Sequence, residues 1–185
     1  MSMFGDGLDA AVHKAFTRPA PKTAPAQMRY LVKHLKGTKP VAQLLRISQR
    51  TVERYVKNQI RKPRPDLAAR MDREVKARWQ PQIRAKARRK AATTSGIVID
   101  TRARIGYTAP IGTTDQDRLR HLTIALPPRY AARLFDAQEQ GATEQHLQKL
   151  AAEALKEVYF QDGGRRAGSL EEVRLTDIEH LEFDL

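Results

Sequence analysis

The sequence predicts a mostly helical α+β protein, in which a helix-turn-helix bundle precedes a small domain made of a β-hairpin and two helices. Three observations support this fold class. Apolar residues recur at helical spacing through residues 26–56. Residues 97–126 are rich in β-branched and aromatic side chains at strand spacing. Two later stretches, 129–140 and 143–160, return to a helical pattern, and Gly141 separates them.

Residues 38–56, TKPVAQLLRISQRTVERYV, are predicted to form two short helices joined by a tight turn. Pro40 suits a first-turn position, where a backbone N–H would have no partner in any case. Ser48 can cap the second helix, because its hydroxyl can accept a hydrogen bond from a first-turn amide. The side chains expected in the shared core are Val41, Ala42, Leu44, Leu45, Val52, Tyr55 and Val56.

The second of these helices directs polar and basic side chains away from the core, as the recognition helix of a helix-turn-helix does. One residue departs from the usual pattern, because Arg46 occupies the turn where Gly is common. The alternative is a plain helical hairpin whose basic face meets only water. The predicted DNA-binding residues are Ser48, Gln49, Arg50, Thr51, Arg54, Lys57, Arg61, Lys62 and Arg64.

The net charge of +13 is unevenly distributed along the chain. Residues 1–100 contain 23 Lys and Arg against 7 Asp and Glu, a balance of +16. Residues 101–185 contain 11 against 14, a balance of −3. The first half is therefore expected to bind a polyanion, of which nucleic acid is the favoured kind. A membrane partner is not expected, because no apolar run approaches the length of a membrane-spanning helix.

Composition shifts predict four segments. A proline-rich stretch, RPAPKTAP, and an acidic stretch near residue 185 mark two of the boundaries. The predicted segments are an N-terminal segment with a linker (1–25), a helix-turn-helix domain with a basic extension ending in RAKARRK (26–90), a hairpin and helical domain (91–162) and an acidic tail (163–185). The tail is expected either to pair at a sheet edge or to engage a partner. The basic extension is interpreted either as a solvated helix face or as an arm that tracks phosphates.

Sequence signatures of catalysis are absent. The chain has no Gly-rich phosphate loop, no HExxH and no GxSxG, and its five histidines are not spaced as metal ligands. It has no cysteine, so disulfides and thiolate chemistry are excluded. We therefore expect no metal and no cofactor on this chain, and no catalytic activity of its own.

A polar connection, residues 111–117, is predicted between strands near residues 97–110 and 120–126, and its stretch Gly112-Thr113-Thr114-Asp115 is the remaining candidate site. Its threonines and aspartates can serve as turn caps that hydrogen-bond to local amides. An exposed hydroxyl on this loop can instead act as a nucleophile, but its activation would have to come from another protein, because no base is placed beside it.

The chain resembles the terminal proteins (Tpg type) of linear Streptomyces chromosomes and plasmids. The resemblance rests on the helix-turn-helix segment, on the basic middle IRKPRPDLAARMDREVKARW and on GYTAPIGTTDQDRLRHLTIALPPRYAARLF, and it covers essentially the whole chain. It implies a protein that is linked covalently to the 5′ end of DNA through a threonine hydroxyl, which replaces an RNA primer. The matching hydroxyl is that of Thr114, with Thr113 as the fallback.

The resemblance also implies the partners of this chain. They are telomeric DNA with a 3′ single-stranded overhang and a terminal duplex, a telomere-associated DNA-binding protein, and a DNA polymerase whose own Mg²⁺ ions carry out the transfer. The implied location is the bacterial nucleoid, at chromosome ends. The alternative function is a helix-turn-helix transcription regulator with a dimerising C-terminal domain.

Overall fold

The computed structural model describes residues 2–108, 114–165, 167–168 and 170–185, and for residues 114–116 it describes the backbone. The chain divides into two compact units. Residues 17–81 form one, which we call the helical unit, and residues 1–16 together with 82–185 form the other, which we call the sheet unit. The helical unit is thus inserted into the sequence of the sheet unit.

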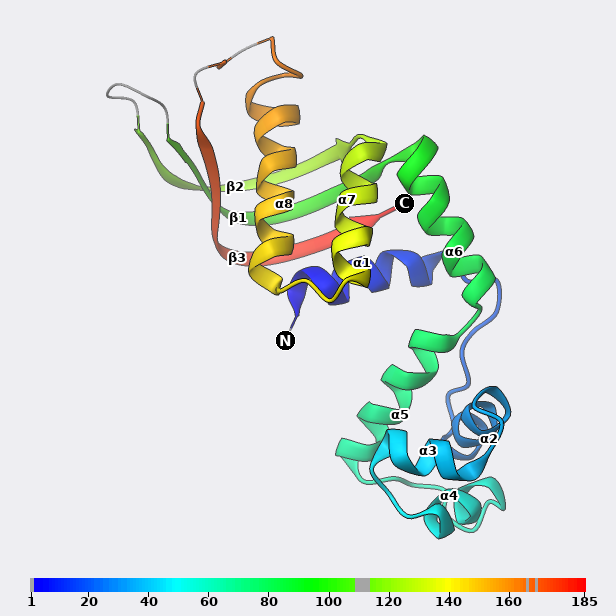
Figure 1. Cartoon of the computed structure of the whole chain (residues 1–185). Coiled ribbons are helices and arrows are strands. Elements are labelled where there is room, and N and C mark those ends of the chain that lie inside the picture. Colours follow the sequence, from blue (N-terminus) through cyan, green and yellow to red (C-terminus); the bar gives the residue numbers. More distant parts are fainter. Residues whose placement is uncertain (1, 109–113, 166, 169) are drawn as a thin grey trace. The chain divides into compact units, whose positions relative to one another are not determined.

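The helical unit contains α2 (Ala24–His34), α3 (Thr38–Leu45), α4 (Gln49–Val56) and α5 (Pro65–Arg78), as Figure 1 shows. Proline lies at the start of α2 and of α5, where its missing N–H costs no helical hydrogen bond. Each helix buries one apolar stripe in a common core, whose largest members include Met28, Leu31, Val41, Leu45, Val52, Tyr55 and Met71. The predicted core of the helix-turn-helix is present, with Leu44 and Val56 at its partly buried margin.

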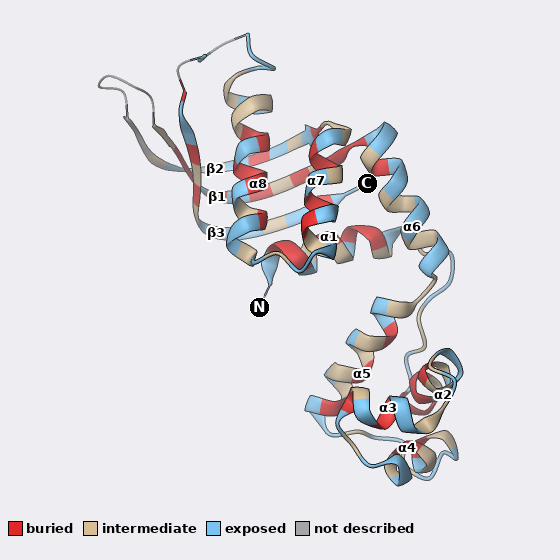
Figure 2. Cartoon of the chain, in the orientation of Figure 1, coloured by how far each residue is buried: buried red, intermediate tan, exposed pale blue. Residues whose placement is uncertain are grey.

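The sheet unit is built on an antiparallel sheet of order β2-β1-β3, formed by β1 (Ile97–Thr108), β2 (Thr114–Leu126) and β3 (Glu172–Asp184). Two helices, α7 (Pro128–Glu139) and α8 (Glu144–Leu155), cover one face of this sheet (Figure 1). Their buried residues face the strands (Figure 2) and meet Ile97, Ile99 and Ile105 of β1 in the core. In the described residues, helices make up 56% and the sheet is small, so the predicted mostly helical α+β class is confirmed.

Two segments connect these elements. Helix α6 (Pro81–Lys90) runs into a π-helical turn, η1 (Ala91–Ser95), and α8 runs into a second one, η2 (Lys156–Phe160). Gly96 follows η1 with φ 72°, and a Cβ at this position would lie 2.1 Å from the carbonyl oxygen of Leu126. Glycine has no Cβ and therefore tolerates both this φ and this close approach. Gly96 thus allows the start of β1 to pack against the end of β2.

The N-terminal residues belong to the sheet unit. Helix α1 (Met3–Lys14) buries Phe4 and Leu8, and the ring of Phe4 lies 6.2 Å from that of Phe183 in β3. The backbone N–H of Phe4 donates to the carboxylate of Glu144 at the start of α8 (2.6 Å). The structure thus differs from the predicted segment 1–25, because residues 1–16 complete a core made largely of residues beyond 90.

The stretch 163–185, predicted as an acidic tail, supplies an edge strand of the sheet unit, so of its two expected roles the structure shows pairing at a sheet edge. β3 pairs with β1 along most of its length and buries Val173, Leu175 and Phe183. On α8 and η2, Gln148 and Lys156 donate to the carbonyl oxygens of Leu175 and Glu171 (2.6 and 2.7 Å). Each of these hydrogen bonds satisfies a backbone carbonyl in β3 or directly before it. Unsatisfied backbone groups on an edge strand are a template for pairing with another chain.

Candidate DNA-binding surface and the β1–β2 hairpin

The turn between α3 and α4 has the geometry of a helix-turn-helix. Arg46 adopts the left-handed conformation (φ 53°, ψ 49°), and the N–H of Ile47 donates to the carbonyl of Ala42 (3.0 Å). A non-glycine residue in this conformation costs about 1 kcal/mol. Arg46 therefore occupies the turn, as the sequence predicts, and its backbone takes the left-handed conformation that Gly adopts without steric cost.

Helix α4 begins at the cap that the sequence predicts. The Ser48 hydroxyl accepts a hydrogen bond from the N–H of Thr51 (3.1 Å), and the two hydroxyl groups lie 2.8 Å apart. Val52 and Tyr55 are buried, and burial raises the pKa of the Tyr55 phenol, so it stays neutral. Ser48 and Thr51 therefore have a structural role in the cap. Gln49, another predicted DNA contact, donates to Glu53 (3.1 Å) and is exposed.

The basic residues of α4 and of the segment that follows it are exposed and unpaired. In the part of the chain that the structure describes, seven cationic side chains of this region make no ion pair and no hydrogen bond. Six of them are predicted DNA contacts, and the seventh belongs to the turn. They are Arg46, Arg50, Arg54, Lys57, Arg61, Lys62 and Arg64. Because no ion pair or hydrogen bond has to be broken first, these side chains are available to bind an anion.

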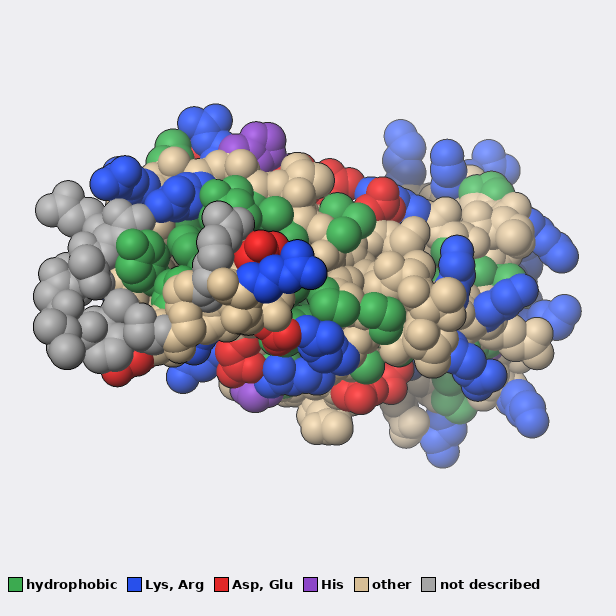
Figure 3. All heavy atoms as spheres, turned by 90° about the horizontal axis from the view of Figure 1, so that it is seen from above, with side chains coloured by type: hydrophobic (Ala, Val, Ile, Leu, Met, Phe, Trp, Pro, Cys, Tyr) green, Lys and Arg blue, Asp and Glu red, His purple; other side chains and the backbone are tan. Residues whose placement is uncertain are grey.

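Three of the four acidic residues of the helical unit lie on α5 and are paired, and the fourth, Glu53 of α4, accepts the hydrogen bond from Gln49. Each of these three residues pairs with the cation four residues later on α5. The pairs are Asp66 with Arg70 (3.1 Å), Asp72 with Lys76 (2.7 Å) and Glu74 with Arg78. This unit holds 17 Lys and Arg against 4 Asp and Glu, a balance of +13, whereas the sheet unit holds 17 of each. The whole net charge of the protein thus lies on the unit that carries the helix-turn-helix. Figure 3 shows one face of the protein, on which blue Lys and Arg side chains outnumber the red Asp and Glu side chains.

Trp79 has a structural position. Its ring packs edge-on against Tyr30 (centroids 5.0 Å apart), and its indole N–H donates to the carbonyl of Arg18 (2.9 Å). Gln80 exchanges hydrogen bonds with Thr17, which holds together the two points where the chain enters and leaves the helical unit. These contacts make Trp79 a packing residue of the helical unit.

The basic run RAKARRK differs from the predicted phosphate-tracking arm at two positions. Arg84 pairs with Asp9 of α1 (2.9 Å), and Arg88 pairs with Glu139 of α7 and lies 3.7 Å from Asp9. Their side chains are only 14% and 17% exposed, so both are used to attach α6 to the sheet unit. Lys86, Arg89 and Lys90 remain exposed.

The threonine predicted as the reactive residue lies at the start of a strand. β2 begins at Thr114, whose backbone is opposite Thr108 of β1, so the predicted polar connection 111–117 is shorter than expected and the second strand longer. Thr113 lies outside the described residues. Figure 1 shows the ends of β1 and β2 near these residues extending beyond α8.

The stem of this hairpin is attached to β3. Arg174 donates to the hydroxyl of Thr108 (2.7 Å), and its other terminal nitrogen lies 3.8 Å from Asp117. Thr176 also donates to Asp117 (3.1 Å). These contacts fix the backbone on both sides of the Thr108–Thr114 pair. Sequence reasoning missed them, because Arg174 and Thr176 belong to the stretch that was interpreted as a tail.

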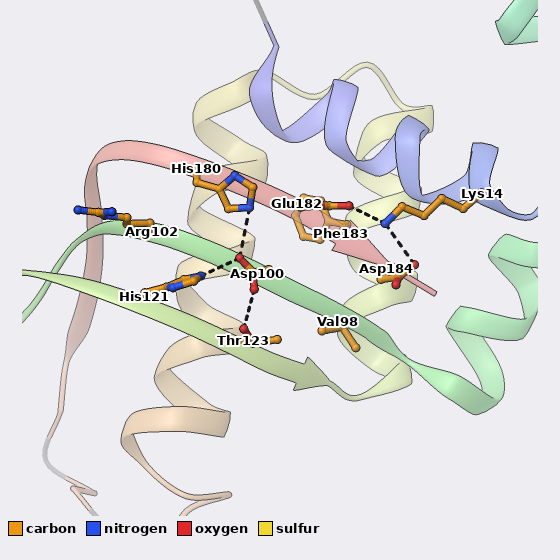
Figure 4. Close-up of a pocket in the computed structure, with 10 residues that line it drawn as sticks. All are labelled: Lys14, Val98, Asp100, Arg102, His121, Thr123, His180, Glu182, Phe183 and Asp184. Atoms are coloured by element: carbon orange, nitrogen blue, oxygen red, sulfur yellow. Dashed lines mark hydrogen bonds and ion pairs between the residues drawn. The ribbon is translucent and has the colours of Figure 1, made fainter.

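The uncovered face of the sheet carries a polar cluster that no sequence motif indicates (Figure 4). Asp100 of β1 accepts a hydrogen bond from Thr123 (2.6 Å), and its Oδ1 lies 3.0 Å from His121 and 3.2 Å from His180. The hydrogen bond from Thr123, then that from His121, lowers the pKa of Asp100. The cluster lines a cavity of about 570 Å³, at whose edge Lys14 pairs with Glu182 (2.6 Å).

Comparison of the chain with protein-family models, curated proteins and solved structures found no match. Among the described residues, no group of three or more His, Cys, Asp or Glu side chains is arranged to hold a metal ion. No described helix is long and apolar enough to cross a membrane.

Proposed function

We propose that this protein binds the ends of linear DNA through the helical unit and primes DNA synthesis there through a threonine hydroxyl. The observation that carries the DNA-binding part is the coincidence of a helix-turn-helix with the entire net charge of +13. The priming part rests on the resemblance to terminal proteins and on the position of Thr114 at the end of a strand pair.

In this proposal α4 enters the major groove. Arg50 and Arg54 lie one turn apart on its exposed side, where they reach base edges and phosphates. Each phosphate that a cation neutralises releases condensed counterions, so the affinity falls steeply with salt. The seven unpaired cations supply this attraction without breaking an ion pair inside the protein.

The priming step is a nucleotidyl transfer. The Thr114 oxygen attacks the α-phosphorus of a deoxynucleoside triphosphate, an O–P bond forms, and the bond from that phosphorus to the leaving pyrophosphate breaks. The hydroxyl proton passes to a base on the polymerase or to solvent. The metal ions that neutralise the developing charge belong to the partner polymerase, so this chain supplies the acceptor and its position.

The proposed partners are those that the resemblance to terminal proteins implies. A telomere-associated DNA-binding protein brings the chain to the 3′ overhang, and the polymerase extends from the attached nucleotide. The location is then the nucleoid, at the chromosome ends. Binding of the helical unit to the same DNA raises the local concentration of the hydroxyl at the template end.

The test is a labelling reaction with the purified full chain, polymerase, the telomere-associated partner, a template with a 3′ overhang and each labelled deoxynucleoside triphosphate in turn. We expect Thr114→Ala to abolish covalent labelling, Thr114→Ser to retain part of it and Thr113→Ala to leave it unchanged. Labelling that survives both alanine changes would contradict the assignment.

A transcription regulator would give a different result. It would protect a symmetric duplex site from nuclease, and no nucleotide would become attached under any of these conditions. Finding such a site without covalent labelling would replace the priming proposal and leave DNA binding through α4 intact.

A further inference from the structure

The segment that joins α4 to α5 begins with a turn at Lys57 and Asn58 and continues as a basic stretch that is held at both ends. At its start, Asn58 accepts a hydrogen bond from Arg29 (3.2 Å), and Ile60 packs against the core of the helical unit. At its end, Arg64 is the N-cap residue of α5 and its carbonyl accepts from the N–H of Ala68 (2.9 Å). The chain between these two anchors has no regular secondary structure.

Three of the four residues from Arg61 to Arg64 are cationic, exposed and, in the described structure, without an ion pair or hydrogen bond from their side chains. The fourth is Pro63, and Pro65 follows. Each proline fixes its own φ and favours an extended conformation for the residue before it. The backbone is therefore ordered before it meets a ligand, which reduces the entropy that binding must overcome.

We propose that Arg61, Lys62 and Arg64 enter the DNA minor groove next to the major groove that holds α4, and that they select an A·T-rich flank. This inference rests on the proposed binding of duplex DNA through α4. Narrow A·T-rich minor grooves concentrate negative potential and attract inserted arginine and lysine side chains. A short extended cationic segment fits such a groove, whereas a helix does not.

The length of the segment suits this arrangement. The next minor groove lies about half a helical turn, roughly 17 Å, along the duplex from the major groove. Lys57 and Asn58 form the turn that ends α4, where Asn58 has φ 58° and the N–H of Gln59 donates to the carbonyl of Arg54 (2.9 Å). The stretch without regular structure follows this turn, and its four steps from Ile60 to Arg64 span about 13 Å at most. Arginine side chains add several ångströms, so the cations of this stretch can reach the neighbouring groove.

The experiment uses the full chain and a duplex selected by it from a library of random 20-base-pair DNA. We expect the selected duplexes to carry an A·T-rich flank on one side of the core site. Replacing adenine by 2,6-diaminopurine in that flank adds an amino group to the minor groove, and should weaken binding about tenfold. Replacing A·T by inosine·cytosine restores the A·T-like minor groove and alters the major groove, and should change affinity by less than twofold.

The double variant Arg61→Ala/Lys62→Ala should bind both analogue duplexes equally, whereas Lys149→Ala, an exposed cation on α8, should discriminate as the unchanged protein does. Random flanks, or a diaminopurine effect that persists in the double variant, would overturn the minor-groove inference. Neither result touches the proposed function, which fails instead if the unchanged protein selects no duplex and shows no salt-dependent binding.

Discussion

The guanidinium of Arg174 donates a 2.7 Å hydrogen bond to the hydroxyl of Thr108, the residue directly opposite Thr114 in the β1–β2 pair. This contact joins β3 to the end of β1, whose other neighbour, β2, carries the proposed acceptor hydroxyl. In the priming proposal Arg174 is therefore a positioning residue, and it can be replaced without changing Thr114.

Arg174→Ala should lower the rate of covalent nucleotide labelling about tenfold, because loss of a positioning contact moves the acceptor out of line with the phosphorus. DNA affinity should stay the same, because Arg174 belongs to the sheet unit. The measurement is initial labelling rate against DNA binding by fluorescence anisotropy. Arg165→Ala, which removes another exposed arginine, is the control, and an equal loss in both variants would count against this role.

Arg46→Gly should stabilise the helical unit by about 0.5 to 1 kcal/mol, because Gly adopts the left-handed turn without steric cost. Urea denaturation followed by circular dichroism gives the free energy of unfolding. Gln43→Gly, at an exposed position inside α3, should instead destabilise by about 1 kcal/mol. Destabilisation by both changes would show that the Arg46 side chain contributes more than its backbone strain costs.

Asp100→Asn should remove a pH dependence of stability at low pH. The pKa of Asp100 is lowered from 3.8 in the folded protein by hydrogen bonds from Thr123 and His121. The group therefore stabilises the fold above pH 3.8, and this contribution is lost as the pH falls through the lowered pKa.

Thermal melts of the unchanged protein and of Asp100→Asn should consequently differ at pH 6 and converge as the pH falls below about 3.8. Asp136→Asn removes a charge from an exposed position on α7 and serves as the matched control. A constant difference between the two melting curves over this whole pH range would contradict the assignment.

Arg88→Ala and Arg89→Ala should behave differently although the two residues are neighbours. Arg88 pairs with Glu139, donates to Gln138 (3.1 Å) and lies 5.3 Å from the ring centroid of Phe135, so its loss should cost about 1 to 2 kcal/mol. Arg89 is exposed, and its loss should change stability by less than about 0.5 kcal/mol. Denaturant titration measures both, and equal values would contradict the role of Arg88 in attaching α6.

The helix-turn-helix could be predicted because its determinants are local. The cap at Ser48, the helical spacing of Val52 and Tyr55 and the turn at Arg46 all lie within ten residues of one another. The surface of α4 followed from the same spacing, since a helix that buries one stripe must expose the other.

The sheet unit could be predicted only in part, because its contacts join distant residues. Alternation in β3 is interrupted near Asp177, which has φ 44°, and the pairing with β1 shifts its register between Arg102 and Arg104. Because of this irregularity and the acidic composition, the sequence pattern did not predict β3 as a strand. The partners of Arg84 and Arg88 lie 50 residues or more away in the sequence, so the run RAKARRK does not indicate that two of its three arginines are paired.

Insertion of the helical unit between α1 and α6 has a consequence for synthesis on the ribosome. The helices of the helical unit are complete once Arg78 has emerged, whereas Phe4 and Leu8 of α1 stay without their full core until Phe183 is made. A nascent chain that stops early therefore contains the four helices of the helical unit and an incomplete sheet unit. Under the proposed function, such a fragment would bind DNA without the complete sheet that positions the acceptor hydroxyl.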